Sequence, residues 1–389
     1  MKTIKLGEVV DLFNGSTPLK TNKNYWEGGD VPWFTVDDLR KQGKYISFTE
    51  KFITELGLKE SSISLIPENA ILLCCTASVG AIAINKIRLT TNQQFNALVV
   101  KDSEQLSVEY LYYWFLANMH TLKSLGRATT IDYVSMSKLR DMALQLPTLE
   151  KQLEIVDKLD SAFAEIDSLE KNLELADERV NQFLQSMLSI EFESNVDGWE
   201  TSNPSAQNTI GVKSVPLKDF CRMYQPPTIS TKEMIPNGEF VVYGANGPIG
   251  RYNKFNHEEP QLLVTCRGAT CGAVNMSGPF AWINGNAMVI QPDLERATLE
   301  YMKYAFLGGI DVSSAITGSA QPQITRTTLE VIEVPLPSLE IQREIVEKLD
   351  KASTEIDLIK EQIEKQKDYA TALRQSLLSN AFTLEEAVA

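Results

Sequence analysis

One stretch of this 389-residue chain is written twice. Residues 146–192 align without a gap with residues 336–382 at a constant offset of 190, and 21 of the 47 aligned positions are identical. Both copies open on the pattern Leu-Pro-x-Leu-Glu-x-Gln, at 146–152 and at 336–342. A repeat this long indicates one supersecondary unit used twice, so the chain is expected to contain two copies of a larger module.

Apolar spacing within the repeat predicts two long helices. Apolar residues follow one another in steps of four and three, which is typical of a coiled-coil seam. A helix from Ile155 to Ile190 would be about 54 Å long at ~1.5 Å per residue, and such a rod acts as a spacer. Its narrow seam is best buried against the other copy, although each helix could instead pack separately into a globular core. The predicted seam positions are Ile155, Leu159, Ile166, Leu169 and Leu173 in the first copy and Ile345, Leu349, Ile356, Ile359 and Ile363 in the second.

The segments outside the helical repeat are related as well. Thr17–Thr54 has no counterpart in Pro226–Asn256, but the residues around these inserts recur. A shared frame with divergent inserts allows one fold to present two different recognition surfaces. The recurring frame segments are 72–82, which parallels 263–274, and 110–116, which parallels 301–307.

The expected fold class is α+β, with two homologous globular modules and a pair of long coiled-coil helices in a pseudo-two-fold internal repeat. Strands are expected at 71–84, 97–100 and 139–146 and at the matching segments 262–275, 287–290 and 329–336, with short helices around Tyr110 and Tyr301. The tyrosines of those helices are interpreted as core residues. The predicted domains are module 1 (1–145), helix 1 (146–192), a linker (193–213), module 2 (214–335), helix 2 (336–382) and a tail (383–389).

Charge is distributed unevenly along the chain. The net charge of −14 argues at first against nucleic acid, because Lys and Arg make the phosphate contacts. Residues 1–145 carry +1, 146–192 carry −7, 193–335 carry −4 and 336–389 carry −4, so the helices and tail hold −11 of the total. The near-neutral modules can still gather a basic face for DNA.

The composition also limits the class of protein. No apolar run approaches the roughly 20 residues needed to span a bilayer, and an acid stands where a signal peptide would be apolar, so a cytoplasmic protein without a membrane partner is expected. Five cysteines without a Cys-x-x-Cys spacing favour buried thiols over a disulfide framework or a zinc ribbon. A metal site from Cys266, Cys271 and His257 is the less favoured alternative.

Catalytic motifs are missing from the sequence. It contains no G-x-x-x-x-G-K-[ST], no G-x-G-x-x-G after a strand and no G-x-S-x-G, and its two histidines offer little for acid–base catalysis. Residues 292–296, Pro-Asp-Leu-Glu-Arg, resemble a nuclease metal signature but are interpreted as a loop. The sequence therefore favours a non-enzymatic protein with no cofactor of its own.

Basic, aromatic and amide residues are concentrated in the inserts and beside them. Arg and Lys suit guanine edges and phosphates, and Asn and Gln suit adenine. Taken one at a time, each residue is better explained as part of a solvated loop. The candidate DNA-binding residues are Lys20, Lys23, Tyr25, Trp33, Arg40, Lys41, Lys44, Asn92 and Gln93 in the first module and Lys232, Tyr243, Asn246, Arg251, Lys254, Arg267, Gln321 and Gln323 in the second.

This order of module, heptad helix, module and heptad helix resembles the specificity subunits of type I restriction-modification enzymes, the HsdS family. The resemblance covers essentially the full chain. Its most specific parts are the helix openings, Thr-Cys-Arg-Gly-Ala-Thr-Cys-Gly at 265–272 and Gly-Ser-Ala-Gln-Pro-Gln-Ile at 318–324. The first module departs from the last of these, with Gly-Arg-Ala-Thr-Thr-Ile-Asp-Tyr-Val at 126–134.

The resemblance implies a non-catalytic protein that directs other subunits to DNA. Each module would be a target-recognition domain that reads one half of a bipartite double-stranded target, and an antiparallel helix pair would set the gap between the halves. Two methyltransferase subunits and the restriction (translocase) subunits would be its partners, and S-adenosylmethionine, ATP and magnesium would belong to them.

Two other readings compete with this one. A coiled-coil scaffold with paired protein- or carbohydrate-binding domains explains the helices and their acidity, but not the shared frames with unrelated basic and aromatic inserts. A DNA methyltransferase acting alone is disfavoured, because Asn203-Pro204-Ser205 lacks the aromatic residue of an adenine-pocket motif.

Overall fold

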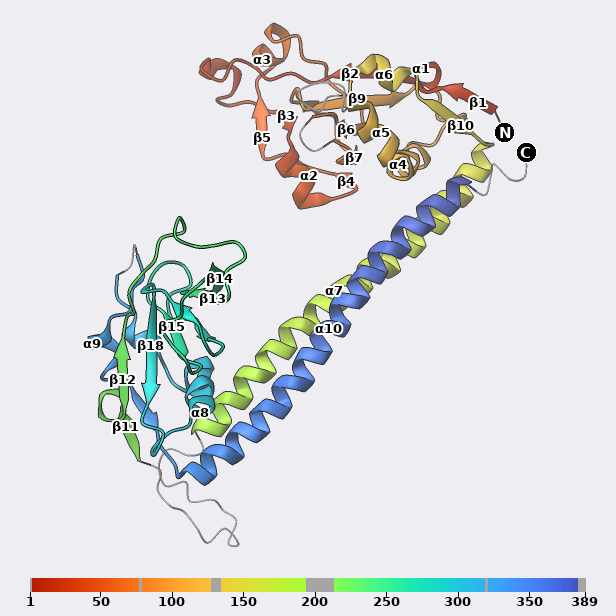
Figure 1. Cartoon of the computed structure of the whole chain (residues 1–389). Coiled ribbons are helices and arrows are strands. Elements are labelled where there is room, and N and C mark those ends of the chain that lie inside the picture. Colours follow the sequence, from red (N-terminus) through yellow and green to blue (C-terminus); the bar gives the residue numbers. More distant parts are fainter. Residues whose placement is uncertain (1, 77–78, 127–133, 194–212, 319–320, 384–389) are drawn as a thin grey trace, which may run out of the picture. The chain divides into compact units, whose positions relative to one another are not determined.

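The computed structural model describes residues 2–76, 79–126, 134–193, 213–318 and 321–383 (Figure 1). They fall into two compact units, one of residues 1–172 and 366–389 and the other of residues 173–365. The predicted linker and tail lie almost entirely outside the described residues. Each unit is therefore a globular module together with parts of both long helices.

The two long helices are of equal length. Helix α7 is Leu149–Glu193 and helix α10 is Leu339–Thr383, each of 45 residues. The start of α7 shares a unit with the end of α10, and the end of α7 shares the other unit with the start of α10, so the two helices pair antiparallel within each unit. The packing of the helices against each other confirms the coiled-coil interpretation.

The first module is built on two main sheets and one two-stranded antiparallel sheet, β1-β10. The larger has the strand order β2-β9-β6-β7-β4, antiparallel except for the parallel pair β7 and β4, and the smaller has the order β5-β3-β8. Strand β6 is buried on both faces, as its continuous apolar run Ile-Leu-Leu-Cys predicts. The strands are β1 (Lys2–Lys5), β2 (Val10–Asn14), β3 (Val31–Phe34), β4 (Tyr45–Ile46), β5 (Lys51–Ile53), β6 (Ile71–Cys74), β7 (Ile82–Asn85), β8 (Thr90–Thr91), β9 (Phe95–Val100) and β10 (Ala143–Leu146).

Short helices surround these sheets. Several of them begin with a side-chain cap, such as Ser107, whose hydroxyl accepts a hydrogen bond from the Tyr110 amide at the start of α4. The helices of the first module are α1 (Leu6–Val9), η1 (Lys23–Tyr25), α2 (Val36–Gln42), α3 (Glu55–Glu60), α4 (Val108–Ala117), α5 (Met119–Gly126) and α6 (Met136–Arg140).

The second module repeats this plan with one strand fewer. Its larger sheet has the order β12-β18-β15-β16 and its smaller sheet the order β14-β13-β17. The larger sheet has no counterpart of β4, the edge strand of the first module's larger sheet. This comparison covers the described residues of both modules. The strands are β11 (Ser214–Pro216), β12 (Cys221–Tyr224), β13 (Phe240–Gly244), β14 (Gly247–Tyr252), β15 (Leu262–Thr265), β16 (Val274–Met276), β17 (Trp282–Ile283), β18 (Ala287–Pro292) and β19 (Glu333–Pro335), and the helices are η2 (Leu217–Asp219), α8 (Leu299–Tyr304), η3 (Ala305–Gly309), η4 (Ser313–Ala315) and α9 (Arg326–Leu329).

Most predicted elements are confirmed by the structure. Strands β6, β7, β15 and β16 form the expected hairpins, and β9 and β18 lie beside them. The strands predicted at 139–146 and 329–336 are too long, because α6 and α9 occupy their first residues and the strands begin at Ala143 and Glu333. Ser135 and Thr325 cap these short helices, and their hydrogen bonds to backbone amides favour a helix where the apolar pattern predicted a strand.

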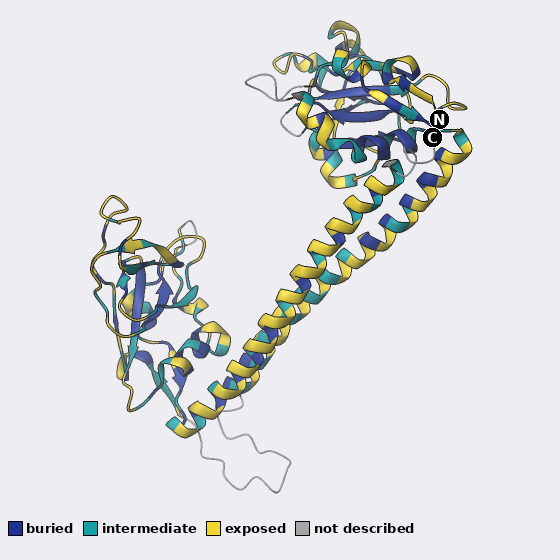
Figure 2. Ribbon diagram, turned by 45° about the vertical axis from the view of Figure 1, so that its right-hand side comes forward, coloured by how far each residue is buried: buried dark blue, intermediate teal, exposed yellow. Residues whose placement is uncertain are grey.

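The buried face of the long helices drifts away from the predicted seam. Eight of the ten seam residues are buried or half-buried, but Leu169 is 40% exposed and its repeat partner Ile359 is 47% exposed (Figure 2). Further along each helix, Leu188 and Leu378 are buried, although neither falls on the four-and-three spacing that starts at Ile155 and Ile345. A straight helix has 3.6 residues per turn, so a strict 3.5-residue pattern moves off the buried face after a few turns.

The end of each long helix packs on a tyrosine of a module. In one unit Phe192 of α7 stacks on Tyr301 with ring centroids 5.0 Å apart, and in the other Phe382 of α10 packs on Tyr110 at 5.3 Å. Both tyrosines are fully buried and donate their hydroxyl protons to backbone carbonyls. The interpretation of the tyrosines as core residues is confirmed.

A buried glutamine joins each module to the helix that follows it. Gln342 ends the Leu-Pro-x-Leu-Glu-x-Gln pattern and is fully buried. Its Oε1 accepts a hydrogen bond from the Thr298 amide at 2.9 Å, and its Nε2 donates to the carbonyls of Arg296 at 2.8 Å and Pro337 at 2.9 Å. Gln152 repeats the three contacts in the first unit, with Ser107, Gln105 and Pro147.

Candidate nucleic-acid interface

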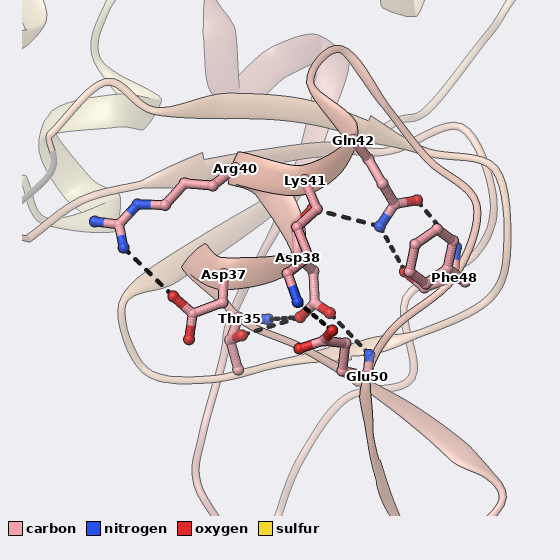
Figure 3. Close-up of polar contacts among 8 residues, drawn as sticks. All are labelled: Thr35, Asp37, Asp38, Arg40, Lys41, Gln42, Phe48 and Glu50. Atoms are coloured by element: carbon pink, nitrogen blue, oxygen red, sulfur yellow. Dashed lines mark hydrogen bonds and ion pairs between the residues drawn. The ribbon is translucent and has the colours of Figure 1, made fainter. Parts of the chain in front are cut away.

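Side-chain hydrogen bonds hold helix α2 of the first insert at both of its ends (Figure 3). Asp38 is 1% exposed, and its carboxylate accepts hydrogen bonds from the Thr35 amide at 2.8 Å, the Thr35 hydroxyl at 3.0 Å and the Glu50 amide at 2.8 Å. Gln42 accepts from the amides of Ser47 and Phe48 at the other end of the helix. These contacts hold α2 and the following loop as one rigid piece.

Two candidate residues lie exposed on α2. Arg40 lies 3.4 Å from Asp37, and Lys41 is paired with Glu50, whose hydrogen bond raises the pKa of Lys41. Surface ion pairs of this kind contribute little to stability and exchange readily. Phosphate groups could therefore replace the two acids as partners of these cations.

The candidate aromatic residues of the first insert belong to its framework. Trp33 is only 5% exposed, packs edge-on against Trp26 with centroids 5.0 Å apart and donates its Nε1 proton to the carbonyl of Ser16. The Tyr25 hydroxyl donates to Glu60 at 2.6 Å, which raises the pKa of Tyr25. These two side chains fold the insert and do not form an open recognition surface.

Lys44 points to the long helix and not to the insert surface. Its Nζ contacts the carboxylate of Asp160 on α7 and lies 3.2 Å from the Tyr113 hydroxyl. The side chain is 19% exposed. Lys44 is thus engaged at the long helix, whereas Lys20 and Lys23 are exposed.

Of the two amide candidates in the first module, Asn92 and Gln93, one is buried and the other is exposed. Asn92 is buried, and its side chain makes hydrogen bonds with both the backbone amide and the side chain of Gln94. Gln93 is exposed and accepts a hydrogen bond from Thr17. Only Gln93 is therefore placed to reach a ligand outside the module.

The second module brings three of its candidate residues together. Arg267, Gln321 and Gln323 line a hollow of about 550 Å³ with Ala245 and Asn286. Arg267 and Gln323 are bridged through their backbones, the Gly268 amide donates to the carbonyl of Pro322 at 3.1 Å, and the Ile324 amide donates to the carbonyl of Cys266 at 2.9 Å. Two segments more than fifty residues apart in the chain are therefore held side by side.

The side chains around this hollow are available to a ligand. Arg267, Gln321 and Gln323 are exposed, and none of their side-chain polar atoms makes a hydrogen bond or ion pair with another described residue. A second hollow of about 300 Å³ also borders Arg267 and Gln323, and its other polar lining residues are Tyr224, Gln225, Thr325 and Arg326. Arg267 thus lies between two recesses.

The other candidate residues of the second module differ in whether their side chains are available to a ligand. Asn246 is exposed in the turn between β13 and β14, next to Ala245 of the hollow, and Lys232 and Lys254 are exposed elsewhere in the insert. Tyr243 accepts a hydrogen bond from the Gly278 amide at 3.0 Å. Arg251 donates to the carbonyls of Gly238 and Glu239, so its guanidinium holds the insert together.

Asn286, Tyr224 and Arg326 were missed by the sequence reasoning. Asn286 stands 190 residues after Asn96, so the repeat offset could have drawn attention to it. The Tyr224 hydroxyl lies 2.7 Å from Nε2 of His257, whose pKa is lowered by burial. Arg326 pairs with Glu330 at 2.7 Å and carried no signal in the sequence pattern.

The first module holds the corresponding loops in the same frame. The Val134 amide donates to the carbonyl of Cys75 at 3.0 Å, which matches the contact between Ile324 and Cys266. Thr76 therefore stands where the second module has Arg267. Most of the pattern at 126–134, which departs from that of the second module, lies outside the described residues.

Neither a metal cluster nor a membrane span is found in the described part of the chain. No group of three or more His, Cys, Asp and Glu side chains is placed to hold an ion there, and Cys266, Cys271 and His257 do not form one. Among the described helices, none combines the length and the apolar character that crossing a bilayer requires.

Comparison with known proteins identifies related sequences along most of the chain. The family model of the type I restriction modification DNA specificity domain matches residues 1–176 and 210–366. The chain is 27% identical over 368 residues to the type I restriction enzyme EcoprrI specificity subunit of Escherichia coli, which covers 90% of this chain and 87% of that protein. It is 37% identical over 158 residues to the type I restriction enzyme MjaIX specificity subunit of Methanocaldococcus jannaschii, which covers 40% of this chain and 36% of that protein.

Solved structures share the fold. A chain from a structural study of complex assembly and conformational transition of the type I R-M system matches with a TM-score of 0.77 at 18% identity, covering 98% of this chain and 97% of that one. The HsdS subunit of Thermoanaerobacter tengcongensis matches with a TM-score of 0.55 at 17% identity, covering 98% and 96%. The predicted fold class, two related modules with two long helices, is confirmed by these matches.

Proposed function

The chain belongs to the family of type I restriction-modification DNA specificity subunits, and from that membership we propose that each of its modules reads one half of a bipartite double-stranded DNA target. The modules share a sheet frame but differ in their inserts, in one strand and in the loop residues at Thr76 and Arg267. The alternative, a scaffold that binds protein or carbohydrate, is not favoured by the family match.

The hollow beside Arg267 supports this proposal most directly. A guanidinium reaches the O6 and N7 atoms of guanine with two hydrogen bonds, and a glutamine amide reaches the N6 and N7 atoms of adenine in the same way. Arg267, Gln321 and Gln323 gather there with side chains that no other described residue engages. We propose that they contact base edges of the second half-site, with Asn246 at the rim and Lys232 and Lys254 on the phosphates.

The first module would read the other half-site with its exposed residues. These are Lys20, Lys23, Arg40, Lys41 and Gln93. We leave Tyr25, Trp33, Lys44 and Asn92 out of this contact set, because burial or internal hydrogen bonds occupy their side chains. Arg251 and Tyr243 of the second module are left out for the same reason.

The long helices are proposed to set the gap between the half-sites. At ~1.5 Å per residue, 45 residues give about 68 Å of helix, and one turn of duplex DNA measures about 34–36 Å. The proposed division is residues 1–145 and 214–335 for the recognition modules and residues 146–192 and 336–382 for the spacers.

We propose that the exposed side of the helices receives the methyltransferase subunits. In one unit Leu169, Tyr369 and Leu373 are 40–67% exposed, and in the other Phe183, Ile190, Leu358 and Ile359 are 47–63% exposed. Leu169 and Ile359 are repeat partners, and so are Phe183 and Leu373, so each unit carries a similar set of exposed apolar side chains. Two such sets match two methyltransferase subunits, because exposed apolar surface marks interaction sites.

The chemistry is assigned to the partners in this proposal. The chain itself is non-catalytic, and S-adenosylmethionine, ATP and magnesium act in the methyltransferase and restriction subunits. The specificity subunit supplies the DNA address and the contact surfaces that place those subunits.

The test starts from the DNA sequence that the complex recognises. Methylation mapped in the host genome with and without this gene identifies the target. The full chain with Arg267→Gln is then assembled with its methyltransferase subunit and tested on duplexes that carry base changes in one half-site. We expect relaxed reading of the second half-site only, by about 1–3 kcal/mol per contact.

Arg40→Gln serves as the matched control for the first module. The same loss of charge there should affect the first half-site and leave the second unchanged. If Arg267→Gln alters both halves equally, or neither, the assignment of one half-site to each module is refuted.

A further inference from the structure

Lys44 ties the first insert to helix α7. Its Nζ contacts the Asp160 carboxylate, lies 3.2 Å from the Tyr113 hydroxyl and sits 4.5 Å from the centre of the Tyr113 ring. The rings of Tyr45 and Tyr112 are 5.1 and 5.4 Å away. The ammonium is therefore enclosed by one carboxylate and three aromatic rings, where its charge interacts more strongly than at an open surface.

Two members of this cluster belong to the repeated frame. The Tyr113 hydroxyl of α4 donates to Asp160 of α7, and in the second unit Tyr304 of α8 donates to Asp350 of α10 at 2.5 Å. Both pairs join a module to the helix that follows it. Burial and the neighbouring aspartate raise the pKa of both tyrosines, so the hydroxyls stay protonated and donate.

The cation of this cluster, the Lys44 ammonium, does not come from the frame that the two modules share. Lys44 comes from the first insert, whereas the ammonium over Tyr304 is that of Lys303, from the same frame helix, with 4.6 Å between the Lys303 Nζ and the ring centre. Among the described residues of the second module, no residue of the insert 226–256 makes a hydrogen bond or an ion pair with Asp350. The contact between insert and long helix is thus a property of the first module.

The backbone around Lys44 connects its contact with Asp160 directly to the end of α2. Helix α2 ends at Gln42, Gly43 caps it with a φ of 75°, and Lys44 follows. The Lys44 carbonyl accepts a hydrogen bond from the Ile84 amide at 2.8 Å, where β4 joins the larger sheet. The end of α2, with Arg40 and Lys41, is therefore two residues from an anchor on both sheet and helix.

We propose that Lys44 is a positioning residue, whose pairing with Asp160 fixes the orientation of the first recognition insert on α7 and thereby the gap between half-sites that the complex accepts. The inference rests on the proposed function, because it takes α2 and its neighbours as the DNA-reading surface. Loss of the ammonium leaves Asp160 bound to Tyr113 alone and releases the insert from the helix. The insert can then pivot and meet a half-site that is displaced along the DNA.

The experiment compares target duplexes with different gaps. The full chain, assembled with its methyltransferase subunit, is titrated with duplexes that carry the mapped target with its natural gap and with gaps one base pair shorter and longer. For Lys44→Met we expect the preference for the natural gap to fall about tenfold, the low end for a hydrogen bond to a charged group. Lys44→Arg, which keeps the charge, should largely retain the preference.

Lys123→Met is the matched control, since Lys123 is exposed on α5 and its loss changes the net charge equally. It should leave the gap preference unchanged. Where Lys44→Met fails to fold, Asp160→Asn removes the ion pair from the other side and should weaken the preference in the same way.

The outcomes separate the two levels of inference. If the wild-type complex selects one gap and Lys44→Met selects it equally well, with or without a loss of thermal stability, the positioning role is overturned. If the wild-type complex ignores duplex DNA, the proposed function fails first. A lower gap preference in both Lys44→Met and Asp160→Asn supports the inference.

Discussion

Replacing Gln342 with leucine should destabilise the second unit by about 3–6 kcal/mol. The side chain is fully buried and pairs with the Thr298 amide and the carbonyls of Arg296 and Pro337. Leucine fills nearly the same volume but offers no polar atom, so all three backbone groups lose their partner. A buried group without a hydrogen bond costs about 1–3 kcal/mol, and partial hydration of the joint favours the lower half of the summed range.

The assay for this prediction is urea unfolding of the full chain. A loss of about 3–6 kcal/mol, divided by a slope of about 2–3 kcal/mol per M urea for a unit of this size, should move the transition of the second unit down by roughly 1–3 M. Amide hydrogen exchange at Thr298 gives a local measurement, because this amide loses its acceptor directly. In Gln342→Leu, exchange of the Thr298 amide should be faster even at urea concentrations below the unfolding transition.

Gln362→Leu is the control on the same helix. Gln362 is exposed, so the same chemical change should alter the free energy of unfolding by less than about 0.5 kcal/mol. Gln152→Leu should shift the first unit in the same way, since its three contacts are the same in kind. If Gln342→Leu and Gln362→Leu unfold at the same urea concentration, the reasoning about the joint is refuted.

Two further predictions concern the helices and the thiols. Ile356→Ala should cost about 2–4 kcal/mol and Ile359→Ala under about 1 kcal/mol in urea unfolding, because Ile356 is buried and Ile359 is 47% exposed; equal losses would contradict the drift of the buried face. Burial raises the pKa of Cys75 to about 12 and of Cys266 to about 11, so at pH 8 both should be alkylated by iodoacetamide far more slowly in the native protein than in urea. Rapid native labelling of either thiol, followed by mass spectrometry, would disprove this.

The sequence repeat predicted the frame well because the repeated positions perform the same physical task in both copies. The two 45-residue helices, the hairpins at β6–β7 and β15–β16 and the buried tyrosines all occur at matching positions. The repeat also contained Gln152 and Gln342, but an apolar pattern does not show that a polar residue at its edge is fully buried. Their role emerged only with the backbone groups that they satisfy.

The inserts were less predictable, since composition does not reveal which way a side chain points. Lys44 and Trp33 looked like recognition residues, but one reaches the long helix and the other packs on Trp26. Conversely, the backbone bridge between residues 267 and 323 brings Arg267, Gln321 and Gln323 together, and the sequence pattern gives no sign of this bridge. Heptad counting also predicts Leu169 and Ile359 on the buried face. Both are exposed, because a helix with 3.6 residues per turn turns them away from that face.

The first unit is assembled from stretches at both ends of the chain, residues 1–172 and 366–389. At a ribosomal rate of about 5–20 residues per second, Leu378 emerges roughly 10–40 s after Ile166, whose cluster it completes. During that interval Ile155, Leu159 and Phe163 have no helix to cover them, while the second module is already being made. Until residue 378 has been made, the nascent polypeptide therefore exposes apolar side chains of an incomplete first unit, and we expect chaperones to bind it during that interval.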